Sequence, residues 1–332
     1  MSKSQQVQAV QSVESARTGA GGRDAARPWG RCGSARTSSL VACAILWVGA
    51  GIGSAQSLDW DGQSGIFATP TAYIAPSGAK GFGAPIVAYH YIDGGQVLGG
   101  FHQVSVTVGG FDRLEFGYSR DLHQEGNTPD LSILWSGGFN IFHAKLNLVS
   151  EKESKQGWLP SLSVGFVART EVRNVGGAMQ GKDTTNADFY GVATKSVTQL
   201  RRLPLVFNLG YKVTNASVLG LAGNAPNYKG EAFGAAAFVV KGPKRCTLVL
   251  GSELMQEPRN VSGLPSAVIP TTISYFARFV PSGAFFSGGT GWRAESPRLS
   301  FDFGLAQVAG TIQPGVNLDA RHQFAFGTSY AF

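Results

Sequence analysis

The sequence predicts an all-β protein, a transmembrane antiparallel β-barrel of about 12 strands, with 14 strands as the alternative. Three observations support this fold class: the composition, an alternation of residue types with a period of two, and a short apolar segment near the N-terminus. Only 15% of the 332 residues are charged, whereas 45 are Gly and 11% are aromatic. Soluble domains average about 25% charged residues. The composition excludes a disordered chain, which would be poor in hydrophobic residues and high in net charge.

Two further classes are excluded by the same inventory. Three cysteines are too few for a disulfide scaffold. After about residue 56, no apolar run approaches the ~20 residues that a membrane-spanning helix needs. A β-protein rich in glycine and aromatic residues, either soluble or in a membrane, remains.

Residues 1–55 are expected to be an N-terminal extension and signal peptide. An apolar run at 40–52 follows Arg31 and Arg36 and ends in Gly53-Ser54-Ala55. A positive region, a short apolar region and small residues are typical of a secretory signal. We expect cleavage after Ala55, so that the mature chain begins at Gln56.

The basic charge of the chain is largely a property of this leader. Six of the 28 basic and two of the 21 acidic residues lie in residues 1–55, which leaves 22 bases against 19 acids and a net charge of +3. The sequence therefore predicts no nucleic-acid partner. Cys246 is the single cysteine after residue 55, so no internal disulfide is expected.

The clearest strand is the last segment of the chain. Its alternating positions are Phe324, Phe326, Thr328, Tyr330 and Phe332, with small or polar residues between them. Strict alternation is typical of a strand with two unlike faces. In a transmembrane barrel the aromatic face meets lipid and the other face meets the lumen. Phe326, Tyr330 and Phe332 resemble the terminal signal that outer-membrane barrels present to the barrel-assembly machinery, an expected partner together with outer-membrane lipid.

The same alternation recurs along the chain. The predicted strands are 82–92, 102–109, 111–120, 138–149, 160–171, 187–196, 204–213, 231–240, 244–253, 271–279, 298–307 and 321–332. Long loops at 93–101, 121–137, 172–186, 214–230, 254–270 and 308–320 alternate with mostly shorter connections. Bacterial barrels have this asymmetry of short periplasmic turns and longer outer loops. If 284–290 and 131–136 are additional strands, the count becomes 14.

A secreted β-sandwich is the alternative fold, since regular short strands with turn signals fit it too. The roughly 277 residues of the mature chain are long for one sandwich. Closure into a barrel also removes the sheet edges that an open sheet must protect. The barrel from 81 to 332 is therefore the prediction that we adopt.

Several motifs carry a resemblance to a known family. They are Gly65-Ile66-Phe67-Ala68-Thr69-Pro70-Thr71-Ala72, Gly81-Phe82-Gly83, Phe101-His102-Gln103-Val104-Ser105, Trp158-Leu159-Pro160-Ser161 and Asp188-Phe189-Tyr190-Gly191. Together they resemble an uncharacterised proteobacterial family of outer-membrane β-barrels, a domain of unknown function of the 3034 type, over most of 58–332. The resemblance implies location in the outer membrane of a Gram-negative bacterium and no assigned activity. The octapeptide at 65–72 also resembles barrels linked to exopolysaccharide secretion.

Alternation places a set of charged side chains on the inner face. The lumen charges are Arg113, Glu115, Lys145, Arg169, Lys212, Arg278, Asp302 and Arg321, with Glu171, Lys195, Arg245 and Glu253 on the same side. An excess of bases would favour anions, because rings of charge set selectivity in pores. Alternatively, these charges pair across the lumen of a plugged barrel, since buried charges must be paired or solvated.

No catalytic, cofactor or metal site is predicted. The five histidines form no metal-spaced pair, and no Ser or acidic pair is placed beside a His as a nucleophilic site requires. We therefore expect no enzyme and no cofactor.

Residues 56–80 precede the first predicted strand and contain Pro70 and Pro76. Proline is poorly tolerated inside a β-ladder, so this N-terminal segment is a possible plug in the lumen. The leading functional hypothesis is a passive pore for small, anionic solutes. The alternatives are a barrel component of cell-envelope exopolysaccharide secretion, and a structural barrel with no transport activity.

Overall fold

The computed structural model describes residues 57–127, 134–153, 158–174, 182–198, 204–217, 222–242, 246–257, 271–281, 299–313 and 316–332, without the side chains of Val97 and of residues 308–322. The predicted leader, with its cleavage site after Ala55, lies outside these residues. Everything described belongs to one compact unit, Val48–Phe332.

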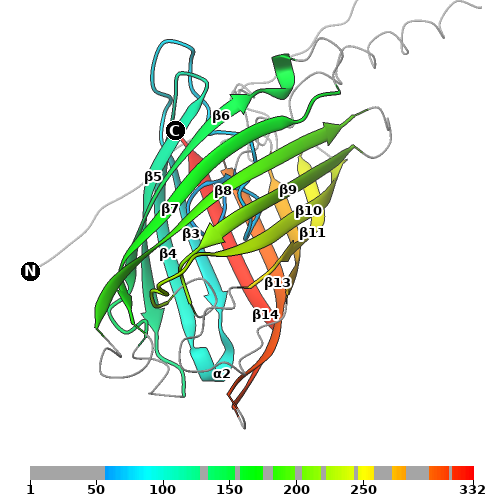
Figure 1. The fold of residues 1–332 in the computed structure, drawn as a ribbon. Helices are drawn as coiled ribbons and strands as arrows, with labels where there is room; N and C mark the ends of the chain where they lie inside the picture. The colour runs from blue at the N-terminus through cyan, green and yellow to red at the C-terminus, as the bar shows by residue number, and fades with distance from the viewer. Residues whose placement is uncertain are drawn as a thin grey trace, which may run out of the picture. The chain divides into compact units, whose positions relative to one another are not determined.

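Twelve antiparallel strands close into a barrel in which each strand pairs with its neighbours in sequence (Figure 1). The strands are β3 (Ile86–Asp93), β4 (Gly100–Gly110), β5 (Leu114–Gln124), β6 (Phe139–Val149), β7 (Ser161–Arg173), β8 (Asp183–Val197), β9 (Leu205–Thr214), β10 (Lys229–Lys241), β11 (Thr247–Met255), β12 (Thr272–Val280), β13 (Leu299–Gln313) and β14 (Val316–Ala331). The last strand closes the ring on the first, with Tyr330 opposite Val87. The predicted fold class and the count of 12 are confirmed.

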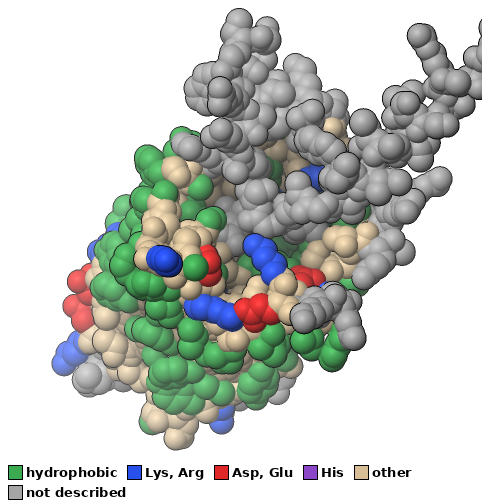
Figure 2. Space-filling view, turned by 90° about the horizontal axis from the view of Figure 1, so that it is seen from above, with side chains coloured by type: hydrophobic (Ala, Val, Ile, Leu, Met, Phe, Trp, Pro, Cys, Tyr) green, Lys and Arg blue, Asp and Glu red, His purple; other side chains and the backbone are tan. Residues whose placement is uncertain are grey.

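Burial alternates along the strands as the sequence predicts. In β6, Ile141, His143 and Lys145 are buried, whereas Phe142 and Leu146 between them are exposed. The inside of the barrel thus holds polar and charged side chains together with a cluster of buried apolar ones, and large apolar side chains cover its outside. Figure 2 shows hydrophobic side chains over the flank, with Lys, Arg, Asp and Glu side chains on the end face that the view looks onto.

Several predicted boundaries differ from the structure, the largest differences being at the first strand and at the last hairpin. The first barrel strand begins at Ile86, and Phe82 forms only an isolated bridge with Gly110. The predicted long loop at 308–320 is instead mostly strand, because β13 and β14 remain paired from Leu299–Tyr330 to Gln313–Val316. Of the two segments that would have raised the count to 14, 284–290 lies outside the described residues, and Leu134–Gly137 is a turn.

The two ends of the barrel differ in what they carry. At the end that holds Ile86 and the C-terminus, which we call the terminal end, β4 and β5 are joined by Phe111–Arg113. At the opposite, distal end, β3 and β4 are joined through the short helix α2 (Gly95–Leu98). β13 ends at Gln313 and β14 begins at Val316, also at the distal end, so the predicted asymmetry of loop lengths does not hold at every hairpin. A 3-10 turn, η2 (Glu151–Glu153), follows β6 at the terminal end.

The chain before β3 lies within the ring of strands rather than outside it. Residues 57–75, which we call the luminal segment, contain the two-residue strands β1 (Ser57–Leu58) and β2 (Ser64–Gly65), which pair only with each other. Leu58, Ala72 and Ala75 are fully buried. Apolar contacts link the segment to the wall, since Ile66 and Phe67 belong to one buried cluster with Ala237 and Phe276.

No helix in the described part of the chain is long and apolar enough to cross a membrane.

The luminal segment leaves the barrel past Gly109, and this crossing has no room for a side chain. A Cβ on Gly109 would lie 2.0 Å from the carbonyl oxygen of Ala75 and 3.0 Å from that of Pro76. Both are backbone atoms, so the segment itself would have to move. We expect Gly109→Ala to destabilise docking of the segment by about 1–3 kcal/mol, the usual cost of overpacking, seen as faster proteolysis within 57–85. Gly191→Ala is the control, because a Cβ there meets nothing within 4 Å; equal proteolysis of the two variants would contradict this account.

Candidate functional site

The luminal segment makes some backbone hydrogen bonds of its own, such as those of the Trp60 N–H to Phe67 and the Thr71 N–H to Ser64, and takes many others from the barrel wall. Hydrogen bonds join it to side chains of 11 of the 12 barrel strands, all except β10. Buried backbone N–H and C=O groups must find partners. The inner face of the wall therefore supplies what secondary structure supplies elsewhere.

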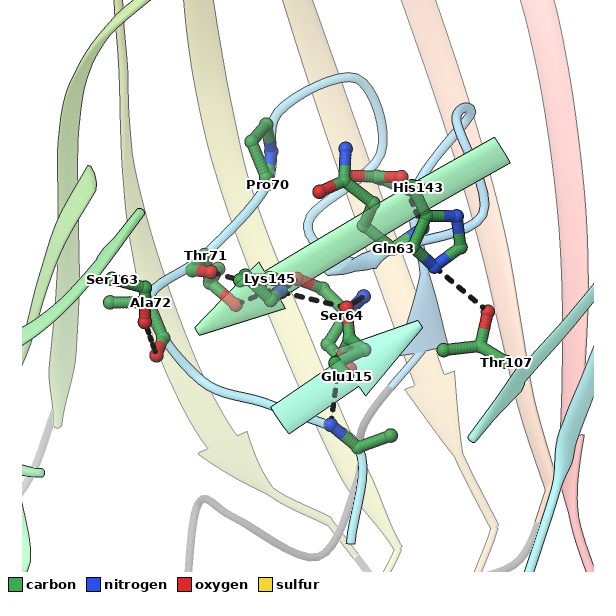
Figure 3. A network of polar contacts seen from close by, with 12 residues as sticks. Gln63, Ser64, Pro70, Thr71, Ala72, Thr107, Glu115, His143, Lys145 and Ser163 are labelled. Carbon is green, nitrogen blue, oxygen red and sulfur yellow. Dashed lines mark hydrogen bonds and ion pairs between the residues drawn. The ribbon is translucent and has the colours of Figure 1, made fainter. Parts of the chain in front are cut away.

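The central contact is a buried ion pair between β5 and β6. Lys145 Nζ lies 3.0 Å from Glu115 Oε1, and both side chains are fully buried. Lys145 also donates to the carbonyl oxygens of Ser64 (2.9 Å) and Thr71 (3.2 Å). Glu115 accepts from the N–H groups of Ser64 (2.9 Å) and Ala75 (2.6 Å). Figure 3 shows Lys145 and Glu115 beside Ser64 and Thr71 of the segment, so that each charge satisfies its partner and the backbone together.

A second pair repeats this arrangement across the lumen. Arg278 Nε on β12 donates to Asp302 Oδ1 on β13 at 2.6 Å. The guanidinium also donates to the carbonyl oxygens of Gly65 (3.1 Å) and Ile66 (2.7 Å). Asp302 in turn accepts from the hydroxyl of Ser57 at 2.5 Å. The planar fork of an arginine suits such divided bonding.

Glu253 on β11 binds the turn of the segment without any basic partner. One of its oxygens accepts from the N–H groups of Phe67 (3.3 Å) and Thr69 (2.9 Å) and from the Thr69 hydroxyl (2.7 Å). Both oxygens accept from the N–H of Ala68, and Ser274 donates to the second. A carboxylate held by several N–H groups is a strong anchor, because hydrogen bonds to ionised groups exceed neutral ones.

Charges on the distal side of the segment pair with one another and with Asp61. Arg169 on β7 donates to Asp188 (2.9 Å) and, with its other nitrogen, to Asp61 (2.9 Å). Lys212 on β9 lies 3.3 Å from Glu231 on β10. Each base is thus matched by at least one carboxylate, as expected for charges withdrawn from water.

Six of the eight predicted lumen charges lie on the inner face: Glu115, Lys145, Arg169, Lys212, Arg278 and Asp302. Arg113 does not, because it belongs to the turn between β4 and β5 and pairs with the exposed Glu153. The side chain of Arg321 lies outside the described residues.

The four further charges behave differently from one another. Glu253 is buried in the lumen. Lys195 pairs at 2.6 Å with Glu151 in η2. Glu171 is exposed and pairs with Arg120, because a register shift between Thr170 and Val172, with a φ of 64° at Glu171, turns this residue out of the alternation. Arg245 lies outside the described residues.

Polar contacts by asparagines were not found from the sequence. Asn147 Nδ2 donates to the carbonyl oxygen of Ala72 at 2.9 Å, and Asn208 Nδ2 donates to that of Pro70 at 2.9 Å. Both residues lie on inward positions of β6 and β9. The sequence prediction considered only charged residues, although the same alternation also places these two asparagine side chains on the inner face.

The aromatic residues of the C-terminal strand lie apart from the lumen. Tyr330 and Phe332 are exposed on the outer side, and their rings contact each other at 5.1 Å between centroids. Phe326 is half-buried and packs against Phe303 of β13.

A cavity of about 180 Å³ lies on the distal side of the luminal segment. We call it the distal cavity. It is lined by aromatic side chains, including Trp60, Phe101, Tyr190 and Phe233, and by Arg169 and Lys212 with their carboxylate partners. Burial raises the pKa of Glu257, a lining residue in the connection after β11 whose carboxylate accepts from the Thr272 hydroxyl.

Within the described ranges, no group of three or more His, Cys, Asp or Glu side chains could hold a metal ion.

Comparison with known proteins identifies one family. The model of the family described as "Protein of unknown function (DUF3034)" matches residues 54–280. No curated protein matches the chain.

Among solved structures, the chain is similar to an outer membrane channel from Pseudomonas putida F1 (11% identity, 80% of this chain and 100% of that chain, TM-score 0.42). It is also similar to the KdgM porin (9%, 74% and 99%, 0.41) and to the NanC porin (8%, 75% and 99%, 0.41).

The ion pair between Lys145 and Glu115 provides a stability test. Lys145→Met leaves the Glu115 carboxylate buried without a counter-charge and removes two hydrogen bonds from the luminal segment. We expect a loss of about 3–5 kcal/mol, the usual cost of breaking a buried pair, measured by urea unfolding of the refolded protein. Arg113→Met is the matched control, since its pair with Glu153 is exposed and should contribute at most about 1 kcal/mol. Similar losses in both variants would show that the buried pair is not a main support.

Proposed function

Because the chain belongs to a family of unknown function, DUF3034, we propose its role from its geometry: it is an outer-membrane β-barrel of a Gram-negative bacterium, a passive channel for small solutes, with the luminal segment as its gate. The observation that carries the proposal is the hydrogen bonding of residues 57–75 to the inner faces of 11 barrel strands. A segment bound in this way narrows the lumen.

The outer surface supports the location in a membrane. Large apolar side chains stand exposed around the strands, among them Leu209, Tyr211 and Phe189. A soluble protein rarely exposes a contiguous apolar surface larger than a few hundred Å². Closure of the barrel also pairs the strand backbones without an open edge, which is the condition for spanning lipid with strands.

The chemistry of the anchors supports gating over a permanent seal. The wall holds the segment through side-chain hydrogen bonds and the ion pair of Arg169 with Asp61. In the described residues the sheet pairing of the segment is internal, between β1 and β2 and at an isolated bridge of Gly65 with Pro70. Hydrogen bonds of this kind exchange for bonds to water when the segment leaves, so the net cost of each is about 0.5–3 kcal/mol. The paired lumen charges equally suit a structural barrel with no transport, and conductance distinguishes the two.

Conductance through a planar bilayer tests the gate. Wild-type protein should show low mean conductance. Glu253→Ala removes the anchor of residues 67–69 and should raise the ratio of open to closed states by about 10–100-fold, because each 1.4 kcal/mol is a factor of ten. Glu153→Ala, an exposed glutamate at the terminal end, is the control and should behave as wild type.

A reversible lock completes the test. The hydroxyl oxygens of Ser57 and Ser329 lie 3.0 Å apart, close enough for the double variant Ser57→Cys/Ser329→Cys to form a disulfide. Oxidation should hold the channel shut, and reduction should restore wild-type conductance, whereas Ser329→Cys alone should respond to neither. Equal conductance in the locked, wild-type and Glu253→Ala proteins would refute the gate. A folded barrel that is silent in all three would favour the structural role or an envelope-secretion partner.

We further propose that the barrel-assembly machinery reads the C-terminal strand through Phe326, Tyr330 and Phe332. Phe332→Ala should lower the amount of protein in the outer membrane of expressing cells, because the exposed aromatic end of β14 would be lost. Phe82→Ala is the matched control, since Phe82 and Phe332 are similarly exposed, at 63% and 62%. Equal membrane levels of the two variants would contradict this role.

A further inference from the structure

The distal cavity has an excess of acids over bases among the described residues. Four carboxylates and two bases line it: Asp61, Asp93, Asp188 and Glu257, with Arg169 and Lys212. Glu231, which pairs with Lys212, adds a fifth carboxylate beside the cavity. The field in the cavity therefore favours positive charge, the opposite of the preference that the lumen charges suggested from the sequence.

Neither of the two lining bases is available to an anion. Arg169 holds Asp188 with one nitrogen and Asp61 with the other. Lys212 Nζ lies 3.3 Å from Glu231 Oε2, and the carboxylates of Asp188 and Glu257 also attract its positive charge. An anionic ligand would have to displace carboxylates that are already in contact, at a cost in desolvation and repulsion.

Buried polar atoms at the cavity are incompletely partnered in the described residues. Glu231 is 2% exposed, and beyond its ion pair with Lys212 at 3.3 Å neither of its carboxylate oxygens accepts a hydrogen bond there. Trp60 is 6% exposed, lines the cavity, and its indole Nε1 has no acceptor. A buried carboxylate without hydrogen bonds is costly, so a bound group that carries positive charge or donates hydrogen bonds would lower the free energy of this site.

Aromatic rings supply the rest of the surface. Trp60, Phe101, Tyr190 and Phe233 border the cavity and belong to one buried cluster. The face of an aromatic ring attracts cations, most strongly where water is excluded. The volume of about 180 Å³ exceeds the ~10–15 Å³ that one water needs by more than about tenfold, so the cavity has room for a small organic molecule.

We propose that the distal cavity binds a small organic cation, an ammonium group on a compact apolar body. The ammonium group lies toward the carboxylates around Lys212, and the apolar body lies against the aromatic rings. This goes beyond the proposed gate, because binding requires only the folded barrel and holds whether or not the barrel conducts.

Three probes of the same shape test the proposal on the refolded protein. They are choline, its neutral isostere 3,3-dimethylbutan-1-ol and the anion 3,3-dimethylbutanoate, titrated by calorimetry in one buffer. We expect choline to bind at least about tenfold more tightly than the neutral isostere, and the anion to bind most weakly. Equal or tighter binding of the neutral probe or of the anion would overturn the proposal, as would the absence of choline binding to folded protein.

Variants locate the binding. Glu231→Gln removes one charge and Trp60→Leu removes one ring, and each should weaken choline about tenfold while affecting the neutral probe less or, for Glu231→Gln, hardly at all. Glu153→Gln is the control at the terminal end, where Glu153 pairs with Arg113 on the surface, and should bind choline as wild type does. If one variant fails to fold, the other variant and the comparison of the three probes still test the proposal. If choline binds the folded cavity variants as tightly as the wild type, the assignment of the site to this cavity is overturned.

Discussion

The structure depends on the need of the luminal segment for hydrogen-bond partners. Nineteen residues of backbone, 57–75, lie inside the barrel with a two-residue strand pairing and a few turn hydrogen bonds of their own, too few to pair all their backbone groups. Their N–H and C=O groups cannot be left unpaired. The wall meets this need with side chains from nearly every strand, and the positions of Glu115, Lys145, Glu253 and Arg278 follow from it.

The need of the segment for hydrogen-bond partners explains why charged residues lie in the interior of the barrel. A buried charge without a partner would destabilise the fold. In the pairs Lys145–Glu115 and Arg278–Asp302, each charge meets its partner and a polar group of the segment at once, a backbone group for Lys145, Glu115 and Arg278 and the Ser57 hydroxyl for Asp302. The pairs are thus less a source of net stability than a means of specifying where the segment lies, since buried pairs rarely gain much over apolar packing.

The two sides of the segment have different chemistry. Toward the terminal end, the polar side chains of the wall, such as Glu115, Lys145 and Asn147, form their hydrogen bonds with the segment itself. Toward the distal end, the segment forms the floor of a cavity, to which it contributes Trp60, Asp61 and Phe67. Any movement of the segment would alter this floor, so occupancy of the cavity and the position of the segment are physically linked.

The sequence by itself determined the class, the strand count and the two faces of the wall. A period of two forces alternate side chains to opposite faces of a strand. Because one face carries small and polar residues and the other carries aromatic residues, the residue types indicate which face points into the lumen. Glu115, Lys145, Arg169, Lys212, Arg278 and Asp302 could be placed in this way from the chain alone. Arg113 and Glu171 could not, because a turn and a bulge each break the period locally.

Only the tertiary structure decided how the interior is filled. The path of residues 57–75 follows no periodicity, since the segment is neither helix nor part of the barrel sheet. Its contacts join residues far apart in the chain, such as Ser57 with Ser329 and Thr69 with Glu253. That the distal cavity is acidic among the described residues depends on the closure of the ring, because closure places Asp93 of β3 around the same space as Asp188 of β8.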